Sequence, residues 1–249
     1  QILPGISDSN RSTQDIIKHA VAEVELPHAG QRGPQKTNPD SLGILTDAPS
    51  VVIRDVNSGV ELMSRGADIK RPIASITKLM TAMVLLDEYD WDWGDEATVL
   101  ESDVREGGRL YYRFNDSLTM DDLFTAMIVA SGNNETLALV REVGESETSF
   151  VQKMNDKARV LGMHDTTFAD PIGLAPEMRS TADDVMVLLH EALKREEILS
   201  RTHQTHVMTT SGNGNQYKIA STNKLFSSLL DEDPYTIVGG KTGSLIEAG

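Results

Sequence analysis

Three short motifs place nucleophilic, basic and amide side chains along the chain. The first is Ser75-Ile76-Thr77-Lys78, in which the lysine follows the serine by three residues. On a helix this spacing puts the amine and the hydroxyl on one face, one turn apart. A serine hydroxyl is a weak nucleophile without a base, and a lysine whose pKa is lowered by burial can serve as that base. The pattern therefore predicts nucleophilic catalysis by Ser75, with Lys78 as its base.

The second and third motifs carry groups suited to binding a ligand. Ser131-Gly132-Asn133 lies in a break between two apolar helical patterns, where short polar side chains can project into a cleft. Lys241-Thr242-Gly243 follows an apolar stretch, and it would place a cation and a hydroxyl beside backbone that a ligand can approach closely. Each motif alone is weak evidence, because an ordinary helix connection or a solvated strand end explains it as well.

Copies of the first two motifs occur elsewhere in the chain. Ser221-Thr222-Asn223-Lys224 repeats the first, and Ser211-Gly212-Asn213 repeats the second within a sequence typical of an Asn-Gly hairpin turn. Roughly one S-x-x-K is expected by chance in a chain of this length. The ordered set is more informative, because S-x-x-K, Ser-x-Asn and K-T-G together are the signature of penicillin-binding proteins and class A β-lactamases.

The resemblance extends beyond the motifs, over roughly Val51 to Gly249. The segment from Arg71 to Ala82 resembles the nucleophile segment of the low-molecular-mass penicillin-binding proteins, the serine D-alanyl-D-alanine carboxypeptidase and endopeptidase family. Four further segments are similar to that family: 154–163, 166–174, 180–184 and 222–225. The family match selects Ser131 over Ser211, and Ser75 over Ser221.

The resemblance implies a role for each matching residue. Ser75 would be the acylated nucleophile, and Lys78 would take its proton. Ser131 would bridge Lys78 and Lys241 in a proton relay. The backbone N–H groups of Ser75 and Ser244 would form the oxyanion hole. The reaction implied is acyl-enzyme formation followed by hydrolysis.

The substrate-binding residues that the resemblance implies are Asn133, Lys241, Thr242, Gly243 and Ser244. Asn133 would hold the amide of the substrate, and Lys241 and Thr242 would bind its terminal carboxylate. The implied ligands are peptidoglycan peptides and β-lactam antibiotics, with no cofactor. The resemblance also implies a periplasmic or other extracytoplasmic location, is compatible with peripheral association with the membrane or wall, and indicates no oligomer.

Other functions are less well supported. A class A β-lactamase needs a glutamate that activates the deacylating water, and no segment resembles the loop that carries it. A catalytically inactive wall-binding module would not be expected to keep all of the motif residues. Carboxypeptidase and endopeptidase activities both remain open, although Ser-Ile-Thr-Lys leans toward the endopeptidase branch. His203 and His206 have H-x-x-H spacing, but no nearby carboxylate supports a metal site.

Composition excludes several classes of protein. The formal net charge of −15 leaves no basic face for nucleic acid. The chain has no cysteine, so it has neither disulfides nor thiolate metal sites. No apolar stretch approaches the length of a membrane span. Because the chain opens at Gln1 rather than Met, the lack of a visible signal peptide is uninformative.

The elements that must position the motifs follow from periodicity and from turn residues. A β-hairpin is expected around Asn57-Ser58-Gly59, and Thr119 should begin a helix with Asp122 completing a capping box. The same pairing is expected of Thr181 and Asp184. The predicted helices run over residues 74–89, from 119 to the break at 131–134, from that break to about 143, and over 147–161 and 181–194; the last predicted element is a strand at 235–245.

The expected fold class is mixed α/β (α+β) of the β-lactamase/transpeptidase-like kind, with an antiparallel sheet flanked by a helical cluster. Residues 1–48 should form an N-terminal helical segment, with a helix at 12–25, and a linker; residues 49–249 should form the catalytic domain. Family members continue with two further strands after the K-T-G segment. We therefore expect a C-terminally truncated fragment, whose last strand has an unpaired edge.

Overall fold

The computed structural model describes residues 33–35, 38, 40, 44–105, 109–228, 231–233 and 235–245. The chain divides into two units, one of residues 1–45 with 53–63 and one of residues 46–52 with 64–249. The predicted helix at 12–25 lies outside the described residues, and the domain boundary near residue 48 stays a prediction. All of the motif residues belong to the second unit.

The predicted hairpin is confirmed. Strands β1 (Val51–Arg54) and β2 (Glu61–Arg65) form a two-stranded sheet. Its turn is closed by backbone bonds between Asp55 and Gly59 and between Asp55 and Val60, each 2.9 Å long. The Asp55 carboxylate also accepts the N–H of Ser58 at 2.8 Å, which is how aspartate commonly stabilises a turn.

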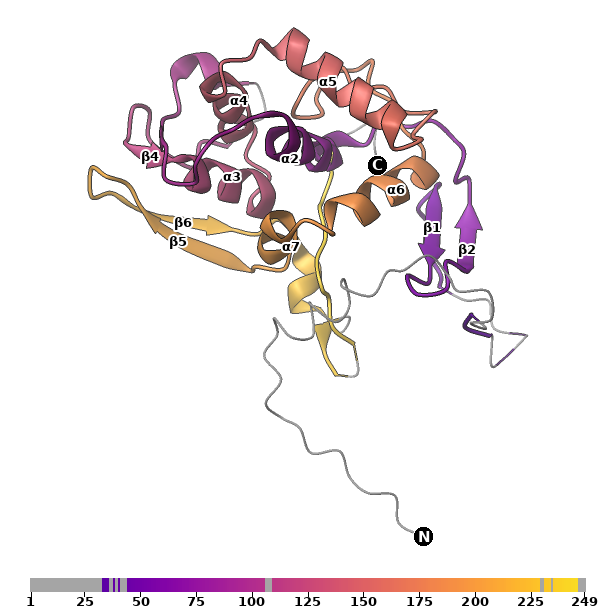
Figure 1. Cartoon of the computed structure of the whole chain (residues 1–249). Helices are drawn as coiled ribbons and strands as arrows, with labels where there is room; N and C mark the ends of the chain where they lie inside the picture. The colour runs from indigo at the N-terminus through magenta and orange to yellow at the C-terminus, as the bar shows by residue number, and fades with distance from the viewer. Residues whose placement is uncertain are drawn as a thin grey trace. The chain divides into compact units, whose positions relative to one another are not determined.

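The helical cluster of the second unit surrounds α2, as Figure 1 shows. This helix follows a 3₁₀ turn, η1, and contacts α3, α4, α5 and α6. Nine of its twelve residues are buried, so both its apolar and its few polar side chains lie in the core. The described helices are η1 (Ala74–Ile76), α2 (Thr77–Glu88), η2 (Glu101–Asp103), α3 (Met120–Val129), α4 (Asn133–Glu142), α5 (Glu147–Val160), α6 (Ala182–Ala192), α7 (Glu196–Thr202) and η3 (Lys224–Ser227). The predicted helices are thus confirmed, and the sequence reading missed α7.

The remaining strands form two antiparallel pairs. Strand β3 (Glu96–Ala97) pairs with β4 (Leu118–Thr119), just before α3. Strand β5 (His206–Thr210) pairs with β6 (Gln216–Ala220) around the turn that holds the second Ser-Gly-Asn copy. That copy is therefore a hairpin turn, as its Asn-Gly sequence indicated. Antiparallel sheets with a helical cluster confirm the predicted mixed α/β class.

The predicted strand at 235–245 is wrong. Within the described residues this segment forms no ladder, and no other strand runs beside it. A strand is held by the hydrogen bonds of a neighbour, and apolar residues alone cannot replace them. The segment instead lies against the start of the α2 region at Gly243, and the side chains of Lys241 and Thr242 bond to Ser131 and Thr222.

The predicted capping box at α3 is confirmed, whereas the one at α6 is only half formed. Thr181 Oγ1 accepts the N–H of Asp184 at 3.1 Å. The Asp184 carboxylate, however, accepts from the Asp165 N–H at 3.0 Å and from the Thr166 hydroxyl at 2.7 Å. It therefore ties α6 to the preceding loop instead of closing the box. Within the described ranges, no helix has the length and hydropathy needed to cross a bilayer.

Replacing Thr119 with alanine should lower the free energy of unfolding by about 1 kcal/mol. Thr119 Oγ1 accepts the Asp122 N–H at 3.2 Å, and the Asp122 carboxylate accepts the Thr119 N–H at 3.0 Å. Urea unfolding should show a lower midpoint with an unchanged slope. Thr119→Ser, which keeps the hydroxyl, should stay close to wild type. An unchanged midpoint in the alanine variant would show that this cap does not stabilise α3.

Candidate active site

Ser75 lies in η1, the 3₁₀ turn that leads into α2. The turn begins at Ala74, a non-glycine residue with φ of +49°. Such a conformation is strained for alanine, and it persists only where the surroundings hold it. Ser75 is half-buried, and its Oγ lies 2.9 Å from Lys78 Nζ. The predicted nucleophile and base are therefore in direct contact.

Lys78 is fully buried and has a complete set of hydrogen-bond acceptors. Its Nζ donates to Ser75 Oγ at 2.9 Å, to Asn133 Oδ1 at 2.7 Å and to the Ile172 carbonyl at 2.9 Å. Burial lowers the pKa of Lys78 well below its ordinary value, and the positive charge of Lys241 lowers it further. A lysine of this kind can become neutral and accept the proton of a serine hydroxyl.

Ser131 and Asn133 approach the site from the connection between α3 and α4. Ser131 has φ of +60°, and its Oγ accepts a hydrogen bond from Lys241 Nζ at 2.7 Å. Among the described residues no hydrogen bond joins Ser131 to Lys78, so only half of the predicted bridge is present. The Asn133 Oδ1 is occupied by Lys78, which makes Asn133 a partner of the base. Its predicted contact with a substrate amide stays a prediction.

The K-T-G segment lies beside both other motifs. Desolvation by burial lowers the pKa of Lys241 to about 7, and its Nζ also donates to the Thr242 carbonyl at 3.0 Å. Thr242 Oγ1 lies 2.5 Å from the hydroxyl of Thr222, a residue of the second S-x-x-K copy. A Cβ on Gly243 would lie 2.7 Å from the Ile73 carbonyl oxygen, so only glycine fits this close approach. Ser244 is exposed.

One contributor to the site, the loop at 170–175, was given no role from sequence. The Asp170 carboxylate accepts backbone N–H groups from Ile172 at 2.7 Å and from Leu174 at 2.8 Å, and also those of Gly173 and Ala175. These bonds fold the loop so that the Ile172 carbonyl faces Lys78. The signal was the Asp-Pro-x-Gly sequence, which is typical of a tight turn capped by its own aspartate.

Gly173 is the position in this loop that must be glycine. It has φ of +87°, and a Cβ there would lie 2.0 Å from the Ala74 carbonyl oxygen. The loop backbone can therefore lie directly against η1, beside the nucleophile. In the part of the chain that the structure describes, no cluster of three or more histidine, aspartate or glutamate side chains could hold a metal.

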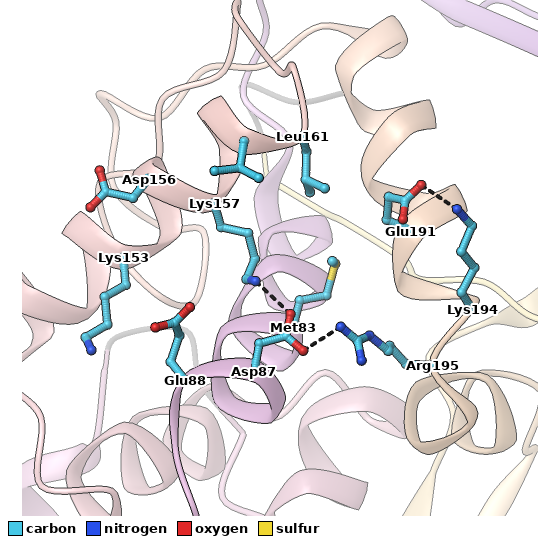
Figure 2. A pocket seen from close by; sticks show the side chains of 11 residues that line it. Met83, Asp87, Glu88, Lys153, Asp156, Lys157, Leu161, Glu191, Lys194 and Arg195 are labelled. Atoms are coloured by element: carbon cyan, nitrogen blue, oxygen red, sulfur yellow. Dashed lines mark hydrogen bonds and ion pairs between the residues drawn. The ribbon is translucent and has the colours of Figure 1, made fainter.

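A separate cleft of about 550 Å³ is lined by residues from the C-terminal half of α2, from α5 and from the end of α6 and the turn after it. Figure 2 shows Lys157 and Arg195 pointing to Asp87 from two sides. Lys157 Nζ lies 2.7 Å from one oxygen of Asp87, and an Arg195 nitrogen lies 2.5 Å from the other. The cleft contains none of the motif residues, and its lining carries four acidic and four basic side chains, so its charges balance. We interpret it as an ionic link between helices.

Asp87→Asn should lower the free energy of unfolding by about 1 kcal/mol, because two part-buried ion pairs lose their shared anion. The same variant should react at Ser75 within about twofold of the wild-type rate, since the cleft is separate from the motifs. Chemical denaturation measures the free energy of unfolding, and the rate of covalent labelling of Ser75 measures its reactivity. Glu101→Gln, which neutralises an exposed acid, is the control. A large loss of reactivity in Asp87→Asn would show that the cleft takes part in the reaction.

Comparisons with known proteins agree with the geometry. Residues 35–249 match the family model described as D-alanyl-D-alanine carboxypeptidase, peptidase S11. The chain is 32% identical to the D-alanyl-D-alanine endopeptidase of Pseudomonas aeruginosa, covering 80% of this chain and 64% of that protein. It is 28% identical to the D-alanyl-D-alanine carboxypeptidase DacF of Bacillus subtilis, covering 81% and 52% respectively. The chain thus spans between half and two thirds of the length of these two curated relatives.

Solved structures show the same likeness. The D-alanyl-D-alanine carboxypeptidase of Mycobacterium tuberculosis superposes with a TM-score of 0.71 at 27% identity, over 85% of this chain and 79% of that one. The Streptomyces K15 DD-transpeptidase superposes with a TM-score of 0.68 at 25% identity, over 76% and 77%. With a family model that matches most of the sequence, the chain belongs to the D-alanyl-D-alanine carboxypeptidase family, peptidase S11, of the low-molecular-mass penicillin-binding proteins.

Proposed function

We propose that this protein is a serine-type D-alanyl-D-alanine peptidase that cleaves peptidoglycan stem peptides or cross-links through an acyl-enzyme on Ser75. The observation that carries the proposal is the contact between Ser75 Oγ and the buried Nζ of Lys78, 2.9 Å apart. Desolvation favours the neutral amine, and a neutral amine at hydrogen-bond distance is the base that serine requires.

The reaction begins when neutral Lys78 takes the hydroxyl proton of Ser75. The freed Oγ attacks the carbonyl carbon of the D-alanyl peptide bond, and the carbonyl oxygen becomes an oxyanion. The C–N bond then breaks, the leaving amine receives a proton from the Lys78 ammonium, and an ester remains on Ser75. Water then attacks the ester carbonyl as Lys78 accepts its proton, the bond to Ser75 Oγ breaks, and Lys78 passes the proton to that oxygen as the acid is released. Each proton that Lys78 takes is returned, so the enzyme ends in its starting state.

Substrate binding uses the cation at the other side of the site. Lys241 and Thr242 bind the terminal carboxylate, and the backbone N–H groups of Ser75 and Ser244 hold the oxyanion. Since an anion favours the charged form of a lysine, a bound carboxylate raises the pKa of Lys241 from about 7. Ser131, which accepts from Lys241, orients that amine. Its role in a proton relay to Lys78 stays a prediction of the family resemblance, since among the described residues only the Lys241 half of that bridge is present.

The relatives are named for both carboxypeptidase and endopeptidase activity, and the proposal covers both. A β-lactam would acylate the same serine, because its ring carbonyl takes the place of the D-alanyl carbonyl. Because the proposed substrate lies in the cell wall, the proposal includes an extracytoplasmic location in the cell envelope, which is compatible with peripheral association with the wall or membrane.

The proposal is tested by incubating the protein with a fluorescent penicillin and locating the adduct by peptide mass spectrometry. A stable adduct on Ser75 is expected, with none in Ser75→Ala. Release of D-alanine from a pentapeptide, compared with cleavage of a cross-linked dimer, then separates the two activities. A folded protein that forms no adduct would contradict the proposal, and rapid turnover of the penicillin would favour a β-lactamase.

A further inference from the structure

A buried carboxyl group lies next to the loop that carries Ser131 and Asn133, and the proposed mechanism does not use it. Glu135 belongs to the first turn of α4, two residues after Asn133, and is 0% exposed. Its Oε1 accepts the N–H of Tyr111 at 3.3 Å. Its Oε2 is buried and has no hydrogen-bond partner among the described residues. Buried carboxyl oxygens are normally satisfied, so an unpartnered one calls for a reason.

The carboxyl of Glu135 fits against the middle residue of the second motif. A Cβ on Gly132 would lie 2.2 Å from Glu135 Oε2. The backbone at Gly132, with φ of −60° and ψ of 119°, is one that any residue adopts. What an added methyl group would meet is the end of the Glu135 side chain, which is fully buried and so has little room to move aside. Gly132 and Glu135 are therefore a matched pair, and the carboxyl touches the same loop that presents Ser131 and Asn133.

Lys78 is the opposite charge that faces Glu135. Asp103, on η2, adds a charge of the same sign. The hydroxyl groups of Tyr111 and Tyr112 donate elsewhere, to the carbonyls of Ala130 and Asp122. Burial raises the pKa of Glu135 to about 7, against the opposing influence of Lys78. The influence is mutual: ionised Glu135 raises the pKa of Lys78, as Asp170 does, whereas Lys241 lowers it.

We propose that Glu135 is a positioning residue for Lys78, whose carboxyl, held against Gly132 behind Asn133, sets the charge state in which Lys78 meets Ser75. The inference rests on the proposed function, since it concerns the base of that reaction. Glu135 contacts neither Ser75 nor a substrate, and it acts through the field at Lys78 and through the shape of the Ser131-Gly132-Asn133 loop.

The electrostatic part predicts a particular dependence on pH. Acylation needs neutral Lys78, so its rate rises as pH passes the pKa of that amine. Ionised Glu135 favours charged Lys78, so the acid limb of the pH–rate profile, the part where the rate rises with pH, lies at higher pH than it otherwise would. A neutral glutamine removes that influence. In Glu135→Gln the acid limb should therefore move to lower pH by about one unit.

The steric part of the proposal predicts that the effects of substitutions at Gly132 and Glu135 on the acylation rate are not additive. Gly132→Ala should slow acylation roughly tenfold, because the new methyl group displaces the carboxyl and with it the loop. In a Glu135→Ala background the space is free, so adding Gly132→Ala should cost less than about twofold. A double-mutant cycle on the acylation rate measures this coupling. Equal costs of Gly132→Ala in both backgrounds would overturn the pairing.

The closing experiment follows the second-order rate of labelling by a fluorescent penicillin between about pH 5 and pH 9. Wild type, Glu135→Gln and the exposed control Glu177→Gln are compared, with thermal unfolding to confirm that each is folded. An acid limb of the pH–rate profile that lies at lower pH in Glu135→Gln, and is unchanged in Glu177→Gln, supports the inference. A profile of unchanged shape, lowered equally at every pH or not lowered at all, overturns it. A folded wild type that is never labelled would instead overturn the proposed function itself.

Discussion

Replacing Lys78 with methionine should slow acylation of Ser75 by about 10³-fold, within the range that general-base catalysis supplies. Methionine fills a similar volume in the buried site but cannot accept a proton. Ser75 would keep its place in η1, whereas its Oγ would lose the amine that now lies 2.9 Å away. Stopped-flow or quench labelling with a fluorescent penicillin measures the rate.

The control is Lys78→Arg, which keeps the positive charge and the donors. Arginine stays protonated at any accessible pH, so it cannot serve as the base. If Lys78 acts by taking the proton, both variants should lose activity. If it acts only as a cation that holds Asn133 and the Ile172 carbonyl, the arginine variant should keep much of it. A methionine variant within tenfold of wild type would contradict the assignment of the base.

The parts of the fold that the sequence predicted are those governed by local chemistry. Thr119 and Asp122 are three residues apart, and their capping box needs nothing beyond the first turn of a helix. The contact between Ser75 and Lys78 has the same origin, because i,i+3 spacing brings the two side chains together. The contact of Lys241 with Ser131 spans 110 residues. It could be expected only from the family resemblance, since no local rule connects such distant positions.

The parts that could not be predicted depend on neighbours that leave no mark on the sequence. Any residue carries a carbonyl, so nothing about Ile172 in the sequence indicates that its carbonyl accepts a hydrogen bond from the Lys78 amine. Glutamate in the first turn of a helix is usually exposed and stabilised by the helix dipole, which hides the burial of Glu135. The stretch from Tyr235 to Val238 satisfies the strand pattern, but a strand also requires an adjacent ladder.

The loop that holds Ile172 gives the second large expected effect. Asp170→Ala should lower the free energy of unfolding by about 3 kcal/mol, because four backbone N–H groups lose a charged acceptor at once. For a chain of this size the melting temperature should fall by about 6–12 °C. Asp165→Ala is the control, since its carboxylate pairs with exposed Lys70 at 3.0 Å and should contribute less than about 1 kcal/mol.

Asp170→Ala should also slow acylation about tenfold at a temperature where the variant is fully folded, because the Ile172 carbonyl no longer stays fixed on Lys78 Nζ. Two effects on that amine oppose each other. Loss of the Asp170 charge lowers the pKa of Lys78 and favours the neutral base, whereas loss of the carbonyl removes what orients it. Labelling rates measured across pH separate the two effects. Loss of the Asp170 charge moves the acid limb of the pH–rate profile to lower pH, whereas loss of the oriented carbonyl lowers the maximal rate reached at high pH, the plateau. A destabilised variant with a wild-type plateau would show that Asp170 supports the loop without orienting Lys78.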